Sequence, residues 1–229
     1  MADRKLFIQT RILKKTIMKS RIFLAITAIL VFAAASEADG QLYYGIRAGG
    51  TLSTQSETGI LWTNDGLRQG FNLGVFGGYR LNEHFSVQTG AKFEEKGMRY
   101  NYINNEGTFR VLRKNDYINI PFLLKGTLGE KSGLPESWSI YGFAGPYAAV
   151  QVYEKEKFIS GHPQDATNLT DSSKSPDFGA VAGAGISKKI RNGHEIFFEL
   201  SYEMGLVKID SNNPDYRNKA SEASFGFRF

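Results

Sequence analysis

The sequence predicts an all-β protein, an eight-stranded antiparallel up-and-down transmembrane β-barrel with short periplasmic turns and long extracellular loops. Three observations lead to this fold class. Apolar and polar residues alternate over most of the chain, glycine supplies 25 of 229 residues, and short and long connections alternate between the segments. The usual share of glycine is about 7%. Alternation with a period of two indicates strands, and unequal connections at the two ends are typical of outer-membrane barrels.

The composition excludes several other classes of protein. Hydrophobic residues make up 41% of the chain, which is too many for a disordered protein. Cysteine is absent, so a disulfide scaffold, a cysteine zinc site and a thiol enzyme are excluded. No run of 18 uninterrupted apolar residues exists that would make a helical membrane span.

Residues 1–40 are predicted to be an N-terminal extension with a signal peptide. Lys19 and Arg21 precede the apolar stretch 22–35, which ends in small residues, as in secretory signals. We expect the mature chain to begin near Gln41, and Met18 is an alternative start. An N-terminal anchor helix is the alternative, but the stretch is shorter than the ~20 residues of a spanning helix. Residues 41–229 then form the barrel domain.

The basic net charge belongs mostly to the leader. The whole chain has 28 Lys and Arg against 23 Asp and Glu. Seven of these bases and three of these acids fall in the first 40 residues, so the barrel domain has an excess of one base. This near balance argues against a nucleic-acid partner.

The first four predicted strands follow the leader in order. Segments 42–53 and 69–80 alternate less regularly than the two that come next. In 84–94, Phe85 and the residues at every second position after it are mostly apolar, and the intervening positions are mostly polar. Segment 117–128 repeats this pattern with Ile118 on its apolar face. One face of each strand is therefore expected to contact lipid.

The remaining four strands are less uniform. In 138–153 and 177–190 small residues occupy both faces. For these two strands the pattern does not decide which face points inward. Segment 194–206 alternates clearly, with glutamates on its polar face. The C-terminal segment 219–229 has aromatic residues at alternate positions.

The predicted connections alternate in length. Residues 81–83, 129–137 and 191–193 form short or moderate turns, and Asn192-Gly193 is a strong hairpin signal. The long polar connections are expected at 54–68, 95–116, 154–176 and 207–218.

A soluble barrel of lipocalin type also alternates, and the pattern alone does not say which face is outside. Unequal loops and an aromatic C-terminal strand favour the membrane. Phe225, Phe227 and Phe229 are predicted to form the signal read by the outer-membrane assembly machinery. An aromatic girdle is expected near the periplasmic end from Tyr43, Tyr44, Tyr79, Phe85, Trp138, Tyr141 and Phe229.

If the apolar faces contact lipid, the charged residues between them point into the lumen. The predicted lumen charge network consists of Arg47, Arg80, Lys92, Glu94, Lys125, Glu199, Glu203 and Arg228. Eight strands leave room only for side chains, and an unpaired buried charge costs several kcal/mol. We therefore expect Glu199 and Glu203 to meet Arg228 and the lumen to be plugged. In the alternative, some of these residues are solvated at the rims.

Two prolines interrupt predicted strands. Pro121 and Pro146 cannot donate ladder hydrogen bonds, and a closed barrel has no edge on which to place them. We expect a bulge or weakened pairing between the fourth and fifth strands at their depth. The alternative is that each proline only loses one bond.

Four phrases carry a resemblance to a known family. They are residues 45–49, 70–74, 85–90 and, most specifically, Tyr117-Ile118-Asn119-Ile120-Pro121-Phe122. With them, residues 41–229 resemble the PorT-like outer-membrane β-barrel family, the porin-family proteins of Bacteroidota with an outer membrane protein beta-barrel domain. The resemblance implies an outer-membrane location and a link of the founding member to protein secretion, but assigns that role to no side chain.

No catalytic, cofactor or metal site is predicted. No histidine lies two or four residues from another, as zinc sites often require. The one candidate constellation for catalysis is His162 with Asp165 or Ser160, and a solvated loop histidine is the simpler interpretation. We therefore expect a protein that is not an enzyme and has no cofactor.

The expected function is that of a structural or binding barrel with extracellular recognition loops. Its expected partners are outer-membrane lipid or lipopolysaccharide, the assembly machinery and an unidentified extracellular or secretion-system protein. The alternative function is a narrow channel or an accessory factor for protein secretion across the outer membrane.

Overall fold

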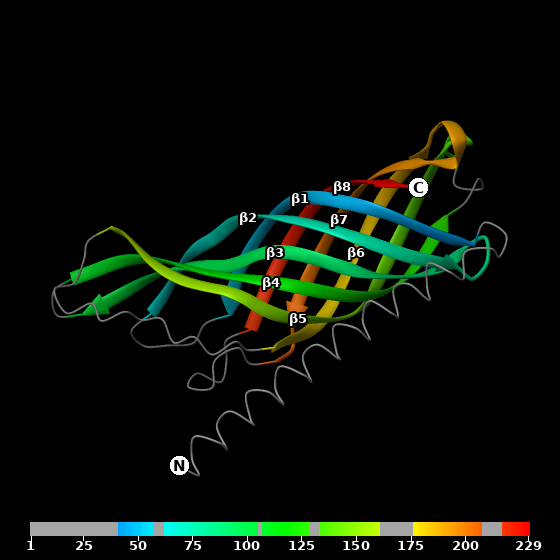
Figure 1. Cartoon of the computed structure of the whole chain (residues 1–229). Coiled ribbons are helices and arrows are strands. Elements are labelled where there is room, and N and C mark those ends of the chain that lie inside the picture. The colour runs from blue at the N-terminus through cyan, green and yellow to red at the C-terminus, as the bar shows by residue number, and fades with distance from the viewer. Residues whose placement is uncertain (1–40, 57–61, 105–106, 129–132, 161–175, 208–216) are drawn as a thin grey trace, which may run out of the picture. The chain divides into compact units, whose positions relative to one another are not determined.

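The structure is a computed structural model that describes residues 41–56, 62–104, 107–128, 133–160, 176–207 and 217–229. These residues form a closed barrel of eight antiparallel strands, each paired with its neighbours in chain order (Figure 1). The strands are β1 Leu42–Ser56, β2 Trp62–Arg80, β3 Phe85–Asn104, β4 Gly107–Leu128, β5 Trp138–Ser160, β6 Pro176–Lys189, β7 Glu195–Gly205 and β8 Arg217–Arg228. The predicted all-β, eight-stranded architecture is confirmed. The leader 1–40 lies outside the described residues.

The two ends of the barrel differ. We call the end with connections 81–84, 129–137 and 190–194 the turn end, and the opposite end the loop end. At the turn end, residues 191–193 form a short 3-10 turn in which Asn192 has a φ of 64° and Gly193 a φ of 78°. This left-handed backbone explains why an Asn-Gly pair stands there.

In the part of the chain that the structure describes, no helix is long and apolar enough to cross a membrane.

The predicted long loops are wrong in their boundaries, because the strands continue into them. β3 and β4 pair along their length to Asn104 and Gly107, where a loop over 95–116 was expected. β5 likewise extends to Ser160. Above the apolar part of the barrel the outward face becomes polar, and the apolar residues Met98, Tyr100 and Val111 lie buried on the other face. Pairing therefore continues where the outward apolar residues have stopped. β3, β4 and β5 consequently rise beyond β7 and β8 at the loop end, on the left of Figure 1.

Burial separates an outer apolar surface from a polar lumen. The outward residues of β4, Ile118, Ile120, Phe122 and Leu124, are all exposed, whereas Asn119 and Lys125, on the alternate positions, are buried. β3 and β7 show the same division. Two of the residues placed in the expected aromatic girdle face the other way: Tyr43 and Tyr141 are 4% and 3% exposed and lie in the lumen. The prediction was wrong for both, because alternation along β1 and β5 puts them on the inward face.

Aromatic residues of β5 occupy the space above glycines of β6. Tyr141, Phe143 and Tyr147 stand directly opposite Gly185, Gly183 and Gly179 in the ladder. A Cβ atom added at any of these glycines would come within 2.5 Å of the facing ring. This arrangement shows which faces of β5 and β6 point inward, a point that the sequence pattern did not decide. The rings point into the lumen, and the glycines make room for them.

The prolines interrupt the ladder without a bulge. β4 and β5 keep one register from Pro121–Tyr147 to Leu124–Ala144, but the two intervening residue pairs are not ladder partners. The β3–β4 ladder has a similar gap between Thr89–Phe122 and Lys92–Asn119. The Thr89 hydroxyl donates a hydrogen bond of 2.8 Å to the carbonyl of Pro121. The pairing is therefore weakened at the expected depth, and the expected bulge is absent between these described residues.

Candidate functional site

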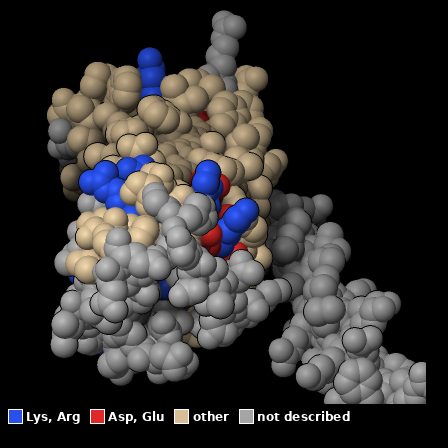
Figure 2. All heavy atoms as spheres, turned by 90° about the vertical axis from the view of Figure 1, so that its left-hand side faces the viewer, with Lys and Arg blue, Asp and Glu red and all other residues tan. Residues whose placement is uncertain are grey.

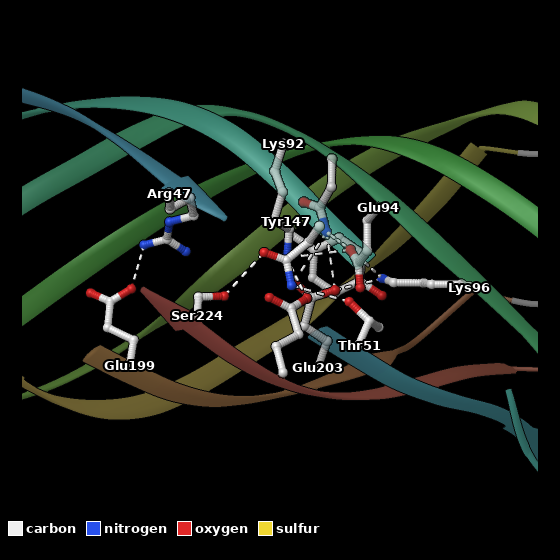
Figure 3. A network of polar contacts seen from close by, with 12 residues as sticks. Arg47, Thr51, Lys92, Glu94, Lys96, Tyr147, Glu199, Glu203 and Ser224 are labelled. Carbon is white, nitrogen blue, oxygen red and sulfur yellow. Dashed lines mark hydrogen bonds and ion pairs between the residues drawn. The ribbon is translucent and has the colours of Figure 1, made fainter. Parts of the chain in front are cut away.

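The most distinctive site is a group of charged side chains that fills the middle of the lumen. Its centre, which we call the central cluster, consists of Lys92, Glu94, Lys96, Glu203 and Glu222, from β3, β7 and β8. All five residues are buried. Alternation brings each of them to the inward face, and closure of the barrel brings β3 opposite β7 and β8 (Figure 3).

The ion pairs of the central cluster are short and shared. The Lys92 ammonium lies 2.7 Å from Glu203 and 3.3 Å from Glu94, and it also contacts Glu222. The Lys96 ammonium lies 2.5 Å from Glu203 and 3.2 Å from Glu94. Each ammonium group therefore contacts at least two carboxylates, and these contacts offset the free-energy cost of burying the charges.

Neutral side chains complete the cluster. Asn119 donates hydrogen bonds to Glu203 at 3.0 Å and to Glu94 at 3.2 Å. The Lys96 ammonium lies 4.9 Å from the ring centre of Tyr147, within range of a cation–π interaction. The Tyr147 hydroxyl in turn donates to Asp177 at 3.1 Å. Side chains of three further strands, β4, β5 and β6, thus support the cluster.

A second group lies nearer the turn end. Glu199 lies 2.5 Å from Arg47 and 2.9 Å from Lys125, and it accepts a hydrogen bond of 2.9 Å from the Tyr141 hydroxyl. We call Arg47, Lys125 and Glu199 the Glu199 group. With the central cluster it places four bases and four acids in the lumen, so the formal charges balance.

Six of the eight residues expected in the lumen network belong to these two groups, and two lie elsewhere. Arg228 pairs at 2.5 Å with Glu195, its direct ladder partner, rather than with Glu199 or Glu203. The expected pairing was wrong because the register puts Arg228 level with the first residue of β7. Arg80, whose side chain is 46% exposed, lies at the turn-end rim 3.7 Å from Glu195.

Glu222 and Lys96 were not predicted to belong to the lumen network. Glu222 shares a face of β8 with Arg228, and that alternation could have identified it. Lys96 continues the inward series of Lys92 and Glu94, but it fell inside a stretch expected to be a loop. His162 and Asp165, the candidate for catalysis, lie outside the described residues.

The turn end opens into a cavity of about 530 Å³. Tyr43, Arg80, Lys125, Glu195 and Arg228 are among the residues that line it. Lys125 also belongs to the Glu199 group, so the charged side chains that fill the lumen begin where this cavity ends.

Carboxylates of the central cluster are the described groups best placed to hold a cation. Ligand oxygens of Glu94, Glu203 and Glu222 lie within 4.8 Å of one another. The ammonium groups of Lys92 and Lys96 already contact these carboxylates. A metal ion would have to compete with both, so the cluster is a set of internal ion pairs rather than an acidic site.

The phenylalanines of the expected assembly signal lie along the barrel's closing seam. Phe225 is 68% exposed on the outer surface, and its ring centre lies 4.7 Å from that of Phe198. Phe227 stands opposite Ile46 and Ile196. Phe229 stacks on Tyr44 with ring centres 5.3 Å apart and donates its N–H to the Tyr44 carbonyl.

Comparison with known proteins finds similarity to outer-membrane β-barrels. A family model described as outer membrane protein beta-barrel domain matches residues 33–211. No curated protein in the comparison matches the chain.

Among solved structures, Ail of Yersinia pestis is 18% identical, with 82% of this chain and 99% of that chain covered and a TM-score of 0.38. OprG of Pseudomonas aeruginosa is 14% identical, with 82% and 95% covered and a TM-score of 0.44. The outer membrane protein W of E. coli is 14% identical, with 84% and 100% covered and a TM-score of 0.40.

Proposed function

The chain belongs to the outer membrane protein beta-barrel domain family, and from this premise we propose that it is a closed, non-enzymatic outer-membrane barrel that presents a binding surface at its loop end. The main support for a closed barrel is its lumen, where the central cluster and the Glu199 group follow one another between the two ends. A pore for solutes needs a water-filled lumen. Here buried, paired side chains take that space.

The rise of the sheet at the loop end supports a binding role. β3, β4 and β5 continue well past the point where β7 ends. Such an extension is not needed to cross the membrane, for which about 9–11 residues per strand suffice. It lifts polar sheet surface out of the membrane, where a partner can reach it.

We propose further that the chain is a PorT-like barrel exported by a cleaved signal peptide. The phrase Tyr117–Phe122 supports this with a structural role: its Asn119 is a hydrogen-bond donor in the central cluster. An accessory role in secretion would use the loop-end surface or the turn-end cavity as a docking place rather than the lumen as a conduit.

Conductance tests the closed-lumen proposal. The refolded wild-type monomer in a planar bilayer is expected to show no large, steady conductance. Glu199→Ala combined with Glu203→Ala is expected to raise the conductance severalfold, because the unpaired bases draw water into the lumen. Glu83→Ala with Glu136→Ala removes two exposed acids of the turn end and is expected to change little. A steady wild-type conductance of porin size would contradict the proposal and favour a channel.

Surface labelling tests the orientation. The chain has no cysteine, so each introduced cysteine gives a unique label. Thr108→Cys and Ser160→Cys at the loop end are expected to react with a membrane-impermeant maleimide in intact cells, whereas Asn82→Cys and Asn192→Cys at the turn end are not. All four should react after the cells are lysed. Reversed accessibility would show that the loop end faces the periplasm.

A further inference from the structure

The outer face of the loop-end extension has a concentration of bases. They come from three neighbouring strands and are Arg99 of β3, Lys114 of β4, and Lys155 and Lys157 of β5. We call these four residues the outer basic face. Arg99, Lys155 and Lys157 are exposed and Lys114 is half-buried. Figure 2, which views the molecule from this end, shows Lys and Arg side chains on the surface in separate groups, one of them beside Asp and Glu side chains.

The ladder puts these four side chains on one side of the sheet. Lys114 stands directly opposite Lys155, while Leu112 stands opposite both Arg99 and Lys157. Direct antiparallel partners share a face, as do residues two apart in a strand. The other side of the same sheet has the buried residues Met98, Tyr100 and Val111.

Acids are few on this face. In the described part of β3, β4 and β5, the acids that share it are Glu95 and Asp116. Arg68 lies 3.0 Å from Asp116 and 3.6 Å from Glu95, so it holds both. The glutamates of β5 at 154 and 156 alternate onto the opposite side, where Glu156 pairs with Arg113 at 2.5 Å. The outer basic face therefore has an excess of positive charge and no ion-pair partner among the described acids.

The position of this face along the barrel shows what lies within its reach. The outward apolar residues of β4 extend from Leu128 to Ile118. At about 3.4 Å per residue and a tilt of about 45°, they cover about 24 Å of membrane depth, close to the ~25 Å apolar band of such barrels. Lys114 and its partner Lys155 follow on the same face about 10 Å further out, and Arg99 and Lys157, level with Leu112, about 14 Å further out. The headgroup layer beyond the hydrocarbon is about 5–8 Å thick, so these bases stand just above it and their long side chains reach it by bending toward the membrane.

We propose that the outer basic face binds the phosphate groups of anionic lipids in the leaflet at the loop end. The apolar band and the basic face lie on the same side of the same strands, so inserting the first holds the second just above the headgroups, within reach of its long side chains. A protein partner with an acidic surface would have to share this layer with lipid. The inference rests on the proposed outer-membrane insertion and adds a lipid class to it.

Site-specific quenching tests the proposal. Leu112→Cys with a fluorophore reports from the middle of the outer basic face. In phosphatidylcholine vesicles, we compare quenching by 10 mol% of nitroxide-labelled phosphatidylglycerol with quenching by equally labelled phosphatidylcholine. The anionic lipid is expected to be enriched about fivefold or more around the wild-type face, since each base near a charged membrane surface adds substantially to attraction.

Two matched variants define the result. Changing all four bases to Gln is expected to bring the ratio of the two quenching efficiencies close to one, and changing Lys114, Lys155 and Lys157 to Arg should preserve the preference. A fluorophore at Leu81→Cys, at the turn end, should report the same ratio in every variant.

An unchanged ratio in the Gln variant that still inserts would overturn the lipid site and leave the proposed function intact. In that case an acidic protein would be the partner to seek. Failure of the wild-type chain to insert into vesicles, judged by protection from trypsin, would overturn both proposals.

Discussion

Glu203→Ala is expected to lower the free energy of unfolding by about 3–5 kcal/mol, the cost of removing one partner from a buried ion pair. Glu203 lies within 2.7 Å of both Lys92 and Lys96 and accepts from Asn119. Its removal leaves two buried ammonium groups with Glu94 and Glu222 as their remaining carboxylates. Urea unfolding of the protein in lipid vesicles, followed by intrinsic fluorescence, measures the loss.

Two control variants separate charge from shape. Glu203→Gln keeps the shape and the acceptor oxygen but removes the charge, so most of the loss is expected to persist. Glu83→Ala removes an exposed carboxylate at the turn end and is expected to change the free energy of unfolding by about 0.5 kcal/mol or less. A loss below about 1 kcal/mol for Glu203→Ala would show that water reaches the central cluster and solvates the lysines.

Deletion of Phe229 is expected to reduce the amount of barrel in the outer membrane severalfold. Its ring stacks on Tyr44 and its N–H bonds to the Tyr44 carbonyl, so the residue ties the last strand to the first where the sheet closes. Only a closed sheet pairs all its backbone groups in hydrocarbon. The folded fraction is measured by heat-modifiable migration of outer-membrane fractions on gels.

Substitutions at the same end provide the comparison. Phe229→Tyr keeps an aromatic ring and is expected to insert normally. Ile190→Ala removes an exposed apolar side chain of the turn end, away from the seam, and should also insert. Normal levels without Phe229 would mean that assembly does not depend on this residue.

How far the sequence predicts the fold depends on the strand. In β7, apolar residues face lipid and charged residues face the lumen, so a period of two identifies both the strand and its facing. In β3 beyond Glu94, the outward side becomes polar and the apolar residues Met98 and Tyr100 lie on the inward side. The alternation thus changes face, and the pattern that identified the earlier part of the strand no longer applies. The 95–116 region was missed for this reason, although its backbone pairs continuously.

The partners within the lumen were harder to predict than its members. Alternation places Lys92 and Glu203 on the inward face, but their meeting depends on how far each strand is shifted against the next around the ring. That shift accumulates over the strands between β3 and β7, and no local pattern records it. Arg228 shows the consequence, because it was assigned to the right face and to the wrong height.

The contacts between β5 rings and β6 glycines also constrain how the protein can change over generations. A larger residue at Gly185 meets the ring of Tyr141, and a smaller residue at 141 leaves a void beside the glycine. Either change alone is harmful, but the two together restore the fit. A Cβ atom at Gly183 or Gly179 would also meet the backbone carbonyl of Leu200 or Met204, which no change of the facing ring relieves. Residues 141 and 185 should therefore change together, whereas Gly179 and Gly183 should stay glycine.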